Sequence, residues 1–192
     1  MRSRRNPERK SGPVSAKKAA GPLICHVAVL GSGTVKEGSP VYKKALLLGK
    51  KLAKEGITVY HGGYGGVMEA VSRGVKDAGG HSVGVTIGKS LRGANPWVGA
   101  EIKAPSWKER LFKLIEKGQA YIFLDGATGT LNELFFVWEM ANKKLHKKPI
   151  IILGRRLHRW VKTLQKDPLL KIPENLHLAP SIPHVIKKLT RG

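Results

Sequence analysis

The chain has 192 residues, of which 41% are hydrophobic and 25% are charged. This length and this hydrophobic content are ordinary for one globular domain with a sizeable core. No apolar run approaches the ~20 residues that a membrane-spanning helix needs, and the basic N-terminus lacks the apolar region of a secretory signal. The single cysteine, Cys25, cannot form an internal disulfide, so the sequence favours a reducing, cytoplasmic location.

The charge balance is strongly basic, with Lys+Arg 35 against Asp+Glu 13 and a formal net charge of +22. Residues 1–22 hold seven basic residues and Glu8, so they carry +6 and leave +16 on the remainder. Such a field attracts polyanions, and it predicts non-specific nucleic-acid binding with a steep dependence on salt. A generally basic, solvated surface explains the same charge, and no recognisable nucleic-acid reader is present in the sequence.

The expected elements follow a disordered basic arm, residues 1–22, in which apolar side chains are almost absent. Residues 23–192 are expected to form a single Rossmann-like nucleotide-binding domain. Short apolar runs, often β-branched, predict buried strands at 23–30, 57–61, 81–86, 120–124 and 149–153. Helical spacing and capping residues predict helices that alternate with them at 40–52, 65–78, 106–117, 131–145, 156–165 and 182–189.

This alternation of strands and helices defines the expected fold. Successive βαβ units with right-handed crossovers build a parallel sheet that is covered on both faces. We therefore predict an α/β fold, a Rossmann-like three-layer α/β/α arrangement with a mostly parallel sheet. Ligands of such sheets bind beyond the carboxyl ends of the strands, near the point where the strand order reverses. Two glycine-rich turns of this chain follow predicted strands and fall in that position.

These two turns are the main candidates for a ligand site. The turn at Asp125–Thr130 leads from a strand into a helix, so its backbone N–H groups and the positive helix end favour a phosphate. Glu133 adds a carboxylate one turn into that helix. The turn at Gly62–Gly66 has four glycines in five positions, which indicates a close backbone approach. Taken alone, this turn is better explained by the dihedral angles of a tight βα connection, but together the two predict a shared cleft.

Familiar cofactor and metal motifs do not fit the sequence. The turn Gly31–Thr34 begins like a dinucleotide fingerprint, but Lys36 stands where its third glycine belongs. His61 stands at the end of the second strand, where the ribose-binding acid is expected. There is no P-loop, and the seven histidines and one cysteine have no metal-ligand spacing. We therefore predict no cofactor and no metal.

Four motifs between residues 24 and 153 occur in the order that is seen in one protein family. Gly31–Gly33 matches a G-S-S/G turn, and Gly62–Met68 matches G-G-x-x-G-L-M. Trp107–Leu111 aligns with M-H-E-R-K, and Asp125–Glu133 reads D-G-A-T-G-T-L-N-E against P-G-G-x-G-T-x-x-E. The chain therefore resembles the LONELY GUY (LOG) family of cytokinin-activating phosphoribohydrolases, long mislabelled as lysine decarboxylases. It is also similar to the molybdenum-cofactor carrier proteins, which share the fold and a Gly-Gly-Val-Met-Glu-Ala-Val segment.

The resemblance implies hydrolysis of the N-glycosidic bond of a purine or cytokinin nucleoside 5′-monophosphate, which gives free base and ribose 5-phosphate. Arg110 and Glu133 match the catalytic arginine and glutamate of the family. The implied substrate-binding residues are Gly126, Thr128, Gly129 and Thr130 for the 5′-phosphate, together with Gly62, Gly63, Gly65, Gly66, Met68 and Ser32. The resemblance also implies a homodimer or a higher homo-oligomer. The alternative is a non-catalytic carrier or sensor of a nucleotide or of molybdenum cofactor.

Three departures from the family pattern and two structural alternatives bear on this assignment. Asp125 and Ala127 stand where the family has proline and glycine, so they add a negative charge and a methyl group near the anion. Leu111 replaces the lysine that follows the catalytic arginine. Thr130–Glu133 also reads as a capping box, so Glu133 has an alternative role as a helix cap. Arg110 has the alternative of an ordinary solvated charge.

Overall fold

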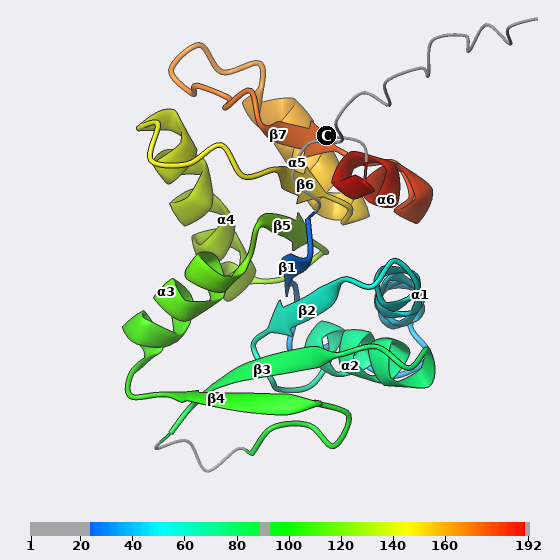
Figure 1. Cartoon of the computed structure of the whole chain (residues 1–192). Helices are drawn as coiled ribbons and strands as arrows, with labels where there is room; N and C mark the ends of the chain where they lie inside the picture. Colours follow the sequence, from blue (N-terminus) through cyan, green and yellow to red (C-terminus); the bar gives the residue numbers. More distant parts are fainter. Residues whose placement is uncertain (1–23, 89–92, 191–192) are drawn as a thin grey trace, which may run out of the picture.

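The structure is a computed structural model that describes residues 24–88 and 93–190 of the chain. Within these residues a seven-stranded sheet is flanked by six helices (Figure 1). The strands are β1 (His26–Leu30), β2 (Thr58–His61), β3 (Ser82–Ile87), β4 (Ala100–Ala104), β5 (Ala120–Phe123), β6 (Ile150–Ile152) and β7 (Leu176–Leu178). The helices are α1 (Pro40–Lys54), α2 (Val67–Asp77), α3 (Trp107–Lys117), α4 (Thr128–Asn142), α5 (Arg155–Leu164) and α6 (Ile182–Thr190).

All neighbouring strands of the sheet are parallel, in the order β4-β3-β2-β1-β5-β6-β7. The predicted Rossmann-like α/β/α fold with a parallel sheet is therefore confirmed. The chain first builds outward from β1 through β2 and β3 to β4, and then returns to place β5 on the other side of β1. The strand order thus reverses between β1 and β5, which is where ligands of this fold class bind.

Helices cover both faces of the sheet and create two apolar cores (Figure 1). Side chains of α1, α2 and α6 fill one core, and those of α3, α4 and α5 fill the other. Strand β1 alternates between them, with Val27 and Val29 in the first core and Ala28 and Leu30 in the second. Because both faces are buried, the central strands read as continuous apolar runs in the sequence.

The two edge strands, β4 and β7, are absent from the sequence-based prediction. Strand β4 has the sequence AEIKA and is mostly exposed, and β7 is only three residues long. Short or charged edge strands limit pairing with other chains, and the same properties hide them from a search for apolar runs.

The helix starts confirm two capping predictions and overturn a third. Ser39 accepts a hydrogen bond from Tyr42 N at the start of α1, and Ser106 accepts one from Glu109 N at the start of α3. Helix α4, however, begins at Thr128 rather than at residue 131, with Ala127 as its N-cap residue and no side-chain cap. The proposed capping box at Thr130–Glu133 is therefore wrong, because both of these residues lie inside the helix.

The predicted arm, residues 1–22, lies outside the described residues, and the division of the chain into an arm and one domain stays a prediction. In the described residues no helix is both long and apolar enough to cross a membrane.

Candidate active site

Three chain turns meet where the strand order reverses. Gly31–Thr34 follows β1, Gly62–Gly66 follows β2, and Asp125–Ala127 connects β5 to α4. Backbone hydrogen bonds join two of these turns and the start of α2, because Ser32 N donates to Asp125 O at 3.1 Å and Val67 N donates to Ser32 O at 2.8 Å. The turns therefore form one connected wall rather than independent loops.

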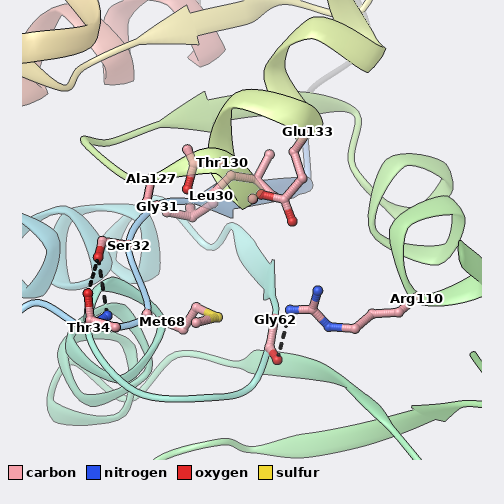
Figure 2. Close-up of a pocket in the computed structure, with 13 residues that line it drawn as sticks. Leu30, Gly31, Ser32, Thr34, Gly62, Met68, Arg110, Ala127, Thr130 and Glu133 are labelled. Carbon is pink, nitrogen blue, oxygen red and sulfur yellow. Dashed lines mark hydrogen bonds between the residues drawn. The ribbon is translucent and has the colours of Figure 1, made fainter. Parts of the chain in front are cut away.

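A cavity of about 210 Å³ opens between these turns (Figure 2). In Figure 2 the start of α4 lies above the cavity, and Arg110 of α3 extends toward it from the right. The lining residues are Val29, Leu30, Gly31, Ser32, Gly33, Thr34, Gly62, Met68, Arg110, Ala127, Gly129, Thr130 and Glu133.

The first turn of α4 forms one end of this cavity. Ala127, Gly129 and Thr130 line the cavity, and no side chain caps the helix. The N–H groups and the positive dipole of the helix start are thus available to a phosphate. Gly126 packs so tightly that a Cβ atom there would collide with Thr130 and lie 3.0 Å from Ser32 N. A glycine is therefore required to bring the two turns together.

Arg110 is held in place by two backbone carbonyl groups, one within β3 and one directly after β2. Its Nε donates to Val85 O at 2.8 Å, and one terminal nitrogen donates to Gly62 O at 3.2 Å. The guanidinium also lies over the Tyr64 ring, 5.4 Å from its centroid. A Cβ atom at Gly62 would collide with the guanidinium, so this glycine makes room for the arginine. Arg110 is half-buried and fixed, which rules out an ordinary solvated charge.

Glu133 faces Arg110 across the cavity (Figure 2). Burial raises the pKa of the Glu133 carboxyl to about 7, although the positive charge of Arg110 acts in the opposite direction. Among the described residues no ion pair within 4.0 Å joins the two side chains. The cavity thus holds a carboxyl group that changes its charge near neutral pH and a fixed cation opposite it.

A buried histidine supports the Gly62–Gly66 turn, a role that sequence reasoning missed. His61 is fully buried, and burial followed by the charge of Arg110 lowers its pKa to about 3. Its Nδ1 accepts from Gly63 N at 3.1 Å, so the ring proton is on Nε2, which lies 2.8 Å from Ser72 Oγ. Ser72 Oγ donates in turn to Met68 O at 2.9 Å. A neutral histidine therefore connects the turn with the helix that carries Met68.

The Asp125 side chain is turned away from the cavity. Its Oδ1 accepts a hydrogen bond from Leu157 N at 2.9 Å and so caps the start of α5, which has no cap of its own from Gly154. Arg156 donates to the carbonyl of Gly126 on the same side. The carboxylate of Asp125, which was expected beside the anion, therefore caps the start of α5 instead. Ala127, the other departure, does line the cavity.

The structure brings together only part of the predicted binding set. Ser32, Gly62, Met68, Gly129 and Thr130 line the cavity with Arg110 and Glu133. The other predicted residues lie beside it: Thr128 lines a separate apolar cavity next to α5, Gly65 lines a second cavity, and Gly63, Gly66 and Gly126 shape the turns. Their roles in binding stay predictions. Thr34 lines the cavity but was not selected, because it has no conspicuous sequence signal, and Ala127 was noted only as a departure from the family motif.

The parallel sheet and the cavity at its switch point define a Rossmann-like α/β protein with an uncapped helix terminus and an arginine–glutamate pair in that cavity. The chain belongs to the SLOG cluster4 family, whose model matches residues 24–177.

Curated relatives agree with the resemblance to the LOG family. The cytokinin riboside 5′-monophosphate phosphoribohydrolase LOG of Oryza sativa subsp. japonica is 39% identical over 127 residues, which cover 64% of this chain and 52% of the relative. A probable enzyme of the same name from rice, LOGL9, is 32% identical over 158 residues, or 76% of this chain and 68% of the relative. The chain thus spans about half the length of the first of these proteins.

Solved structures show the same fold. The X-ray structure of the protein TM1055 has a TM-score of 0.71 and 28% identity, and the match covers 85% of this chain and 97% of that one. The molybdenum cofactor binding protein from Rippkaea orientalis has a TM-score of 0.69 and covers 85% and 94% of the two chains. Its identity to this chain is 24%, so this likeness concerns the fold alone.

Proposed function

We propose that the chain hydrolyses the N-glycosidic bond of a purine nucleoside 5′-monophosphate to free base and ribose 5-phosphate. The observation that carries the proposal is the placement of Glu133 opposite Arg110, in a cavity that ends at the uncapped start of α4. Phosphate at that helix start and ribose between the two side chains give the phosphate and the sugar of such a substrate complementary groups. Relatives named as phosphoribohydrolases support the same reaction.

Each of the two side chains has a distinct part in this proposal. Cleavage of the C1′–N bond leaves positive charge on the ribose, and the leaving base takes the bonding electrons and then a proton from solvent. Ionised Glu133 stabilises that charge and accepts a proton from the water that attacks C1′. Its pKa of about 7 lets it act as a base near neutral pH. Arg110, fixed by Val85 O and Gly62 O, presents its remaining donors to the ribose hydroxyl groups.

The direct test is incubation of the purified chain with AMP and other nucleoside monophosphates, followed by chromatographic detection of free base. We expect base release from the wild type and a loss of at least ~100-fold for Glu133→Gln and for Arg110→Met. Leu169→Ala is a matched control, because this side chain is 91% exposed. Base release that is unaffected by both site variants would remove the assigned roles.

A non-catalytic carrier or sensor of a phosphorylated ligand is the second candidate. It is favoured by Ala127, which places a methyl group in the cavity where glycine stands in the family motif. Tight binding of a nucleotide or of molybdenum cofactor without any product would select this candidate. The variant Ala127→Gly then tests why catalysis is absent. If only this variant turns over, the methyl group of Ala127 is the cause of the lost catalysis.

The cytoplasmic location, the homo-oligomer and polyanion binding remain proposals that follow from the sequence. Analytical ultracentrifugation tests the oligomer. Binding of nucleic acid that weakens steeply with salt and is indifferent to base sequence tests the effect of the net charge of +22.

A further inference from the structure

A second cavity of about 430 Å³ adjoins the candidate active site. It shares Gly33, Thr34 and Met68 with the first cavity, so the two form one continuous groove. The remaining lining residues are Tyr64, Gly65, Glu69, Gly93 and Asn95. The roles proposed above for Arg110, Glu133 and the start of α4 concern the first cavity and leave this second cavity without a ligand group.

If the chain binds a nucleoside monophosphate as proposed above, the groove fixes the order in which phosphate, ribose and base lie along it. The uncapped start of α4 and the pair of Arg110 and Glu133 lie in the first cavity. With phosphate and ribose placed there, the base extends past Met68 into the second cavity. Glu69 follows Met68 on α2, so its carboxylate lies at the wall that the base reaches.

Glu69 is held in a fixed orientation with one oxygen atom left to accept. Tyr42 donates its hydroxyl to Glu69 Oε1 at 3.0 Å. Burial and the bond to Glu69 raise the pKa of Tyr42, which keeps this hydroxyl protonated and donating. Glu69 Oε2 lies next to Gly65, and in the described part of the chain it receives no hydrogen bond. A carboxylate oxygen accepts only, so its complement is a hydrogen-bond donor, which on a purine base is an N–H group.

The amide side chain of Asn95 in the second cavity is already engaged. The amide of Asn95 donates to the carbonyls of Gly63 and Tyr64 at 3.1 and 2.9 Å, and its oxygen accepts from Trp97 N. The Tyr64 hydroxyl accepts from Ile87 N at 3.0 Å. Among the described residues that line this cavity, Glu69 alone carries a carboxylate, and its Oε2 is a free acceptor, whereas the Tyr64 hydroxyl offers a donor.

We propose that Glu69 is a specificity-determining residue that selects a base with an exocyclic amino group. An amino group donates to Oε2, whereas a C–H or a carbonyl at the same place leaves the carboxylate desolvated or opposed by a second acceptor. The expected ligand class is thus an aminopurine nucleotide. Purine riboside 5′-monophosphate, which has hydrogen in place of the amino group of AMP, is the probe that isolates this contact.

The test measures kcat/KM for AMP and for purine riboside 5′-monophosphate. We expect the wild type to prefer AMP by about tenfold, as for one hydrogen bond to a charged group in a partly open site. Glu69→Ala reduces this ratio to about one, and Glu69→Gln, which keeps an acceptor for Tyr42, gives an intermediate ratio. Glu139→Gln is the control, because Glu139 pairs with Lys143 at 3.4 Å outside both cavities, and it keeps the wild-type ratio.

Two outcomes separate this inference from the proposed function. Equal activity of the wild type on both nucleotides, or an equal loss on both in Glu69→Ala, overturns the role of Glu69 while hydrolysis stands. If neither nucleotide releases base, the hydrolase proposal fails, and calorimetric Kd values for the same two probes decide the role of Glu69. Equal Kd values then overturn it, and a preference for AMP that is lost in Glu69→Ala supports it.

Discussion

Arg110 of α3 and Glu133 of α4 face each other across the cavity, and the charge of the arginine opposes the rise that burial causes in the pKa of the glutamate. Arg110 is bound to two backbone carbonyls instead of forming an ion pair with the carboxylate. The two side chains are thus coupled through the cavity while space for a ligand remains between them.

The pKa of Glu133 sets the expected pH dependence of catalysis. If ionised Glu133 is the base, kcat/KM for AMP should rise with pH and level off above about 7. Rates of base release between pH 5.5 and 8.5 measure this profile, and Glu133→Gln should be inactive throughout. A rate that falls as the pH increases through 7 would contradict a general base and indicate that the protonated form is active.

The same shift predicts that Glu133 destabilises the folded chain at high pH. Its pKa is raised from 4.5 to about 7, so the folded state holds a proton that the unfolded state has released. The stability that this proton provides is fully present below pH 4.5 and is lost as the pH rises through 7. Glu133→Gln should therefore unfold at a higher temperature than the wild type at pH 8 and at a similar temperature at pH 4.5. Calorimetry at both pH values checks this, and equal melting temperatures at pH 8 would argue for an exposed carboxylate.

Removal of the opposing charge should raise the pKa of Glu133 further. Arg110→Met keeps an unbranched, shorter apolar side chain but deletes the cation, so burial acts on the carboxyl without opposition. Side-chain carbon NMR of Glu133 measures the shift directly, and Arg110→Lys is the control that retains the charge. A pKa that stays at its wild-type value in Arg110→Met would mean that the two groups do not interact.

The sequence was sufficient for the features that repeat or carry a strong local signal. Apolar runs located five of the seven strands in the described residues, and Ser39 and Ser106 marked two helix starts. The helix start that matters for the site was misplaced, because Thr128–Thr130 lacks the apolar spacing that defines the rest of α4. The direction of the Asp125 side chain was also out of reach, since it depends on α5, 30 residues further along the chain.

The chain of hydrogen bonds through His61 gives a prediction about stability. Ser72→Ala leaves the buried Nε2–H of His61 without an acceptor, so it should reduce the free energy of unfolding by about 1–3 kcal/mol. Thr163→Ala is a matched control, because its hydroxyl also donates to a carbonyl four residues earlier but is exposed. This control should cost less than about 0.5 kcal/mol. Urea unfolding measures both, and equal losses would mean that the contact with His61 contributes nothing.

Substitutions of Asp125 separate the effect of its charge on ligand binding from its effect on stability. Its carboxylate caps α5 through Leu157 N and is directed away from the cavity, so Asp125→Ala should lower stability by about 1 kcal/mol. Asp125→Asn retains the accepting oxygen and should lose less. Neither variant should tighten nucleotide binding, because the charge does not lie against the phosphate site. Calorimetric Kd values for AMP check this, and a clear gain of affinity in Asp125→Asn would show that the carboxylate repels the bound anion despite its role as a cap.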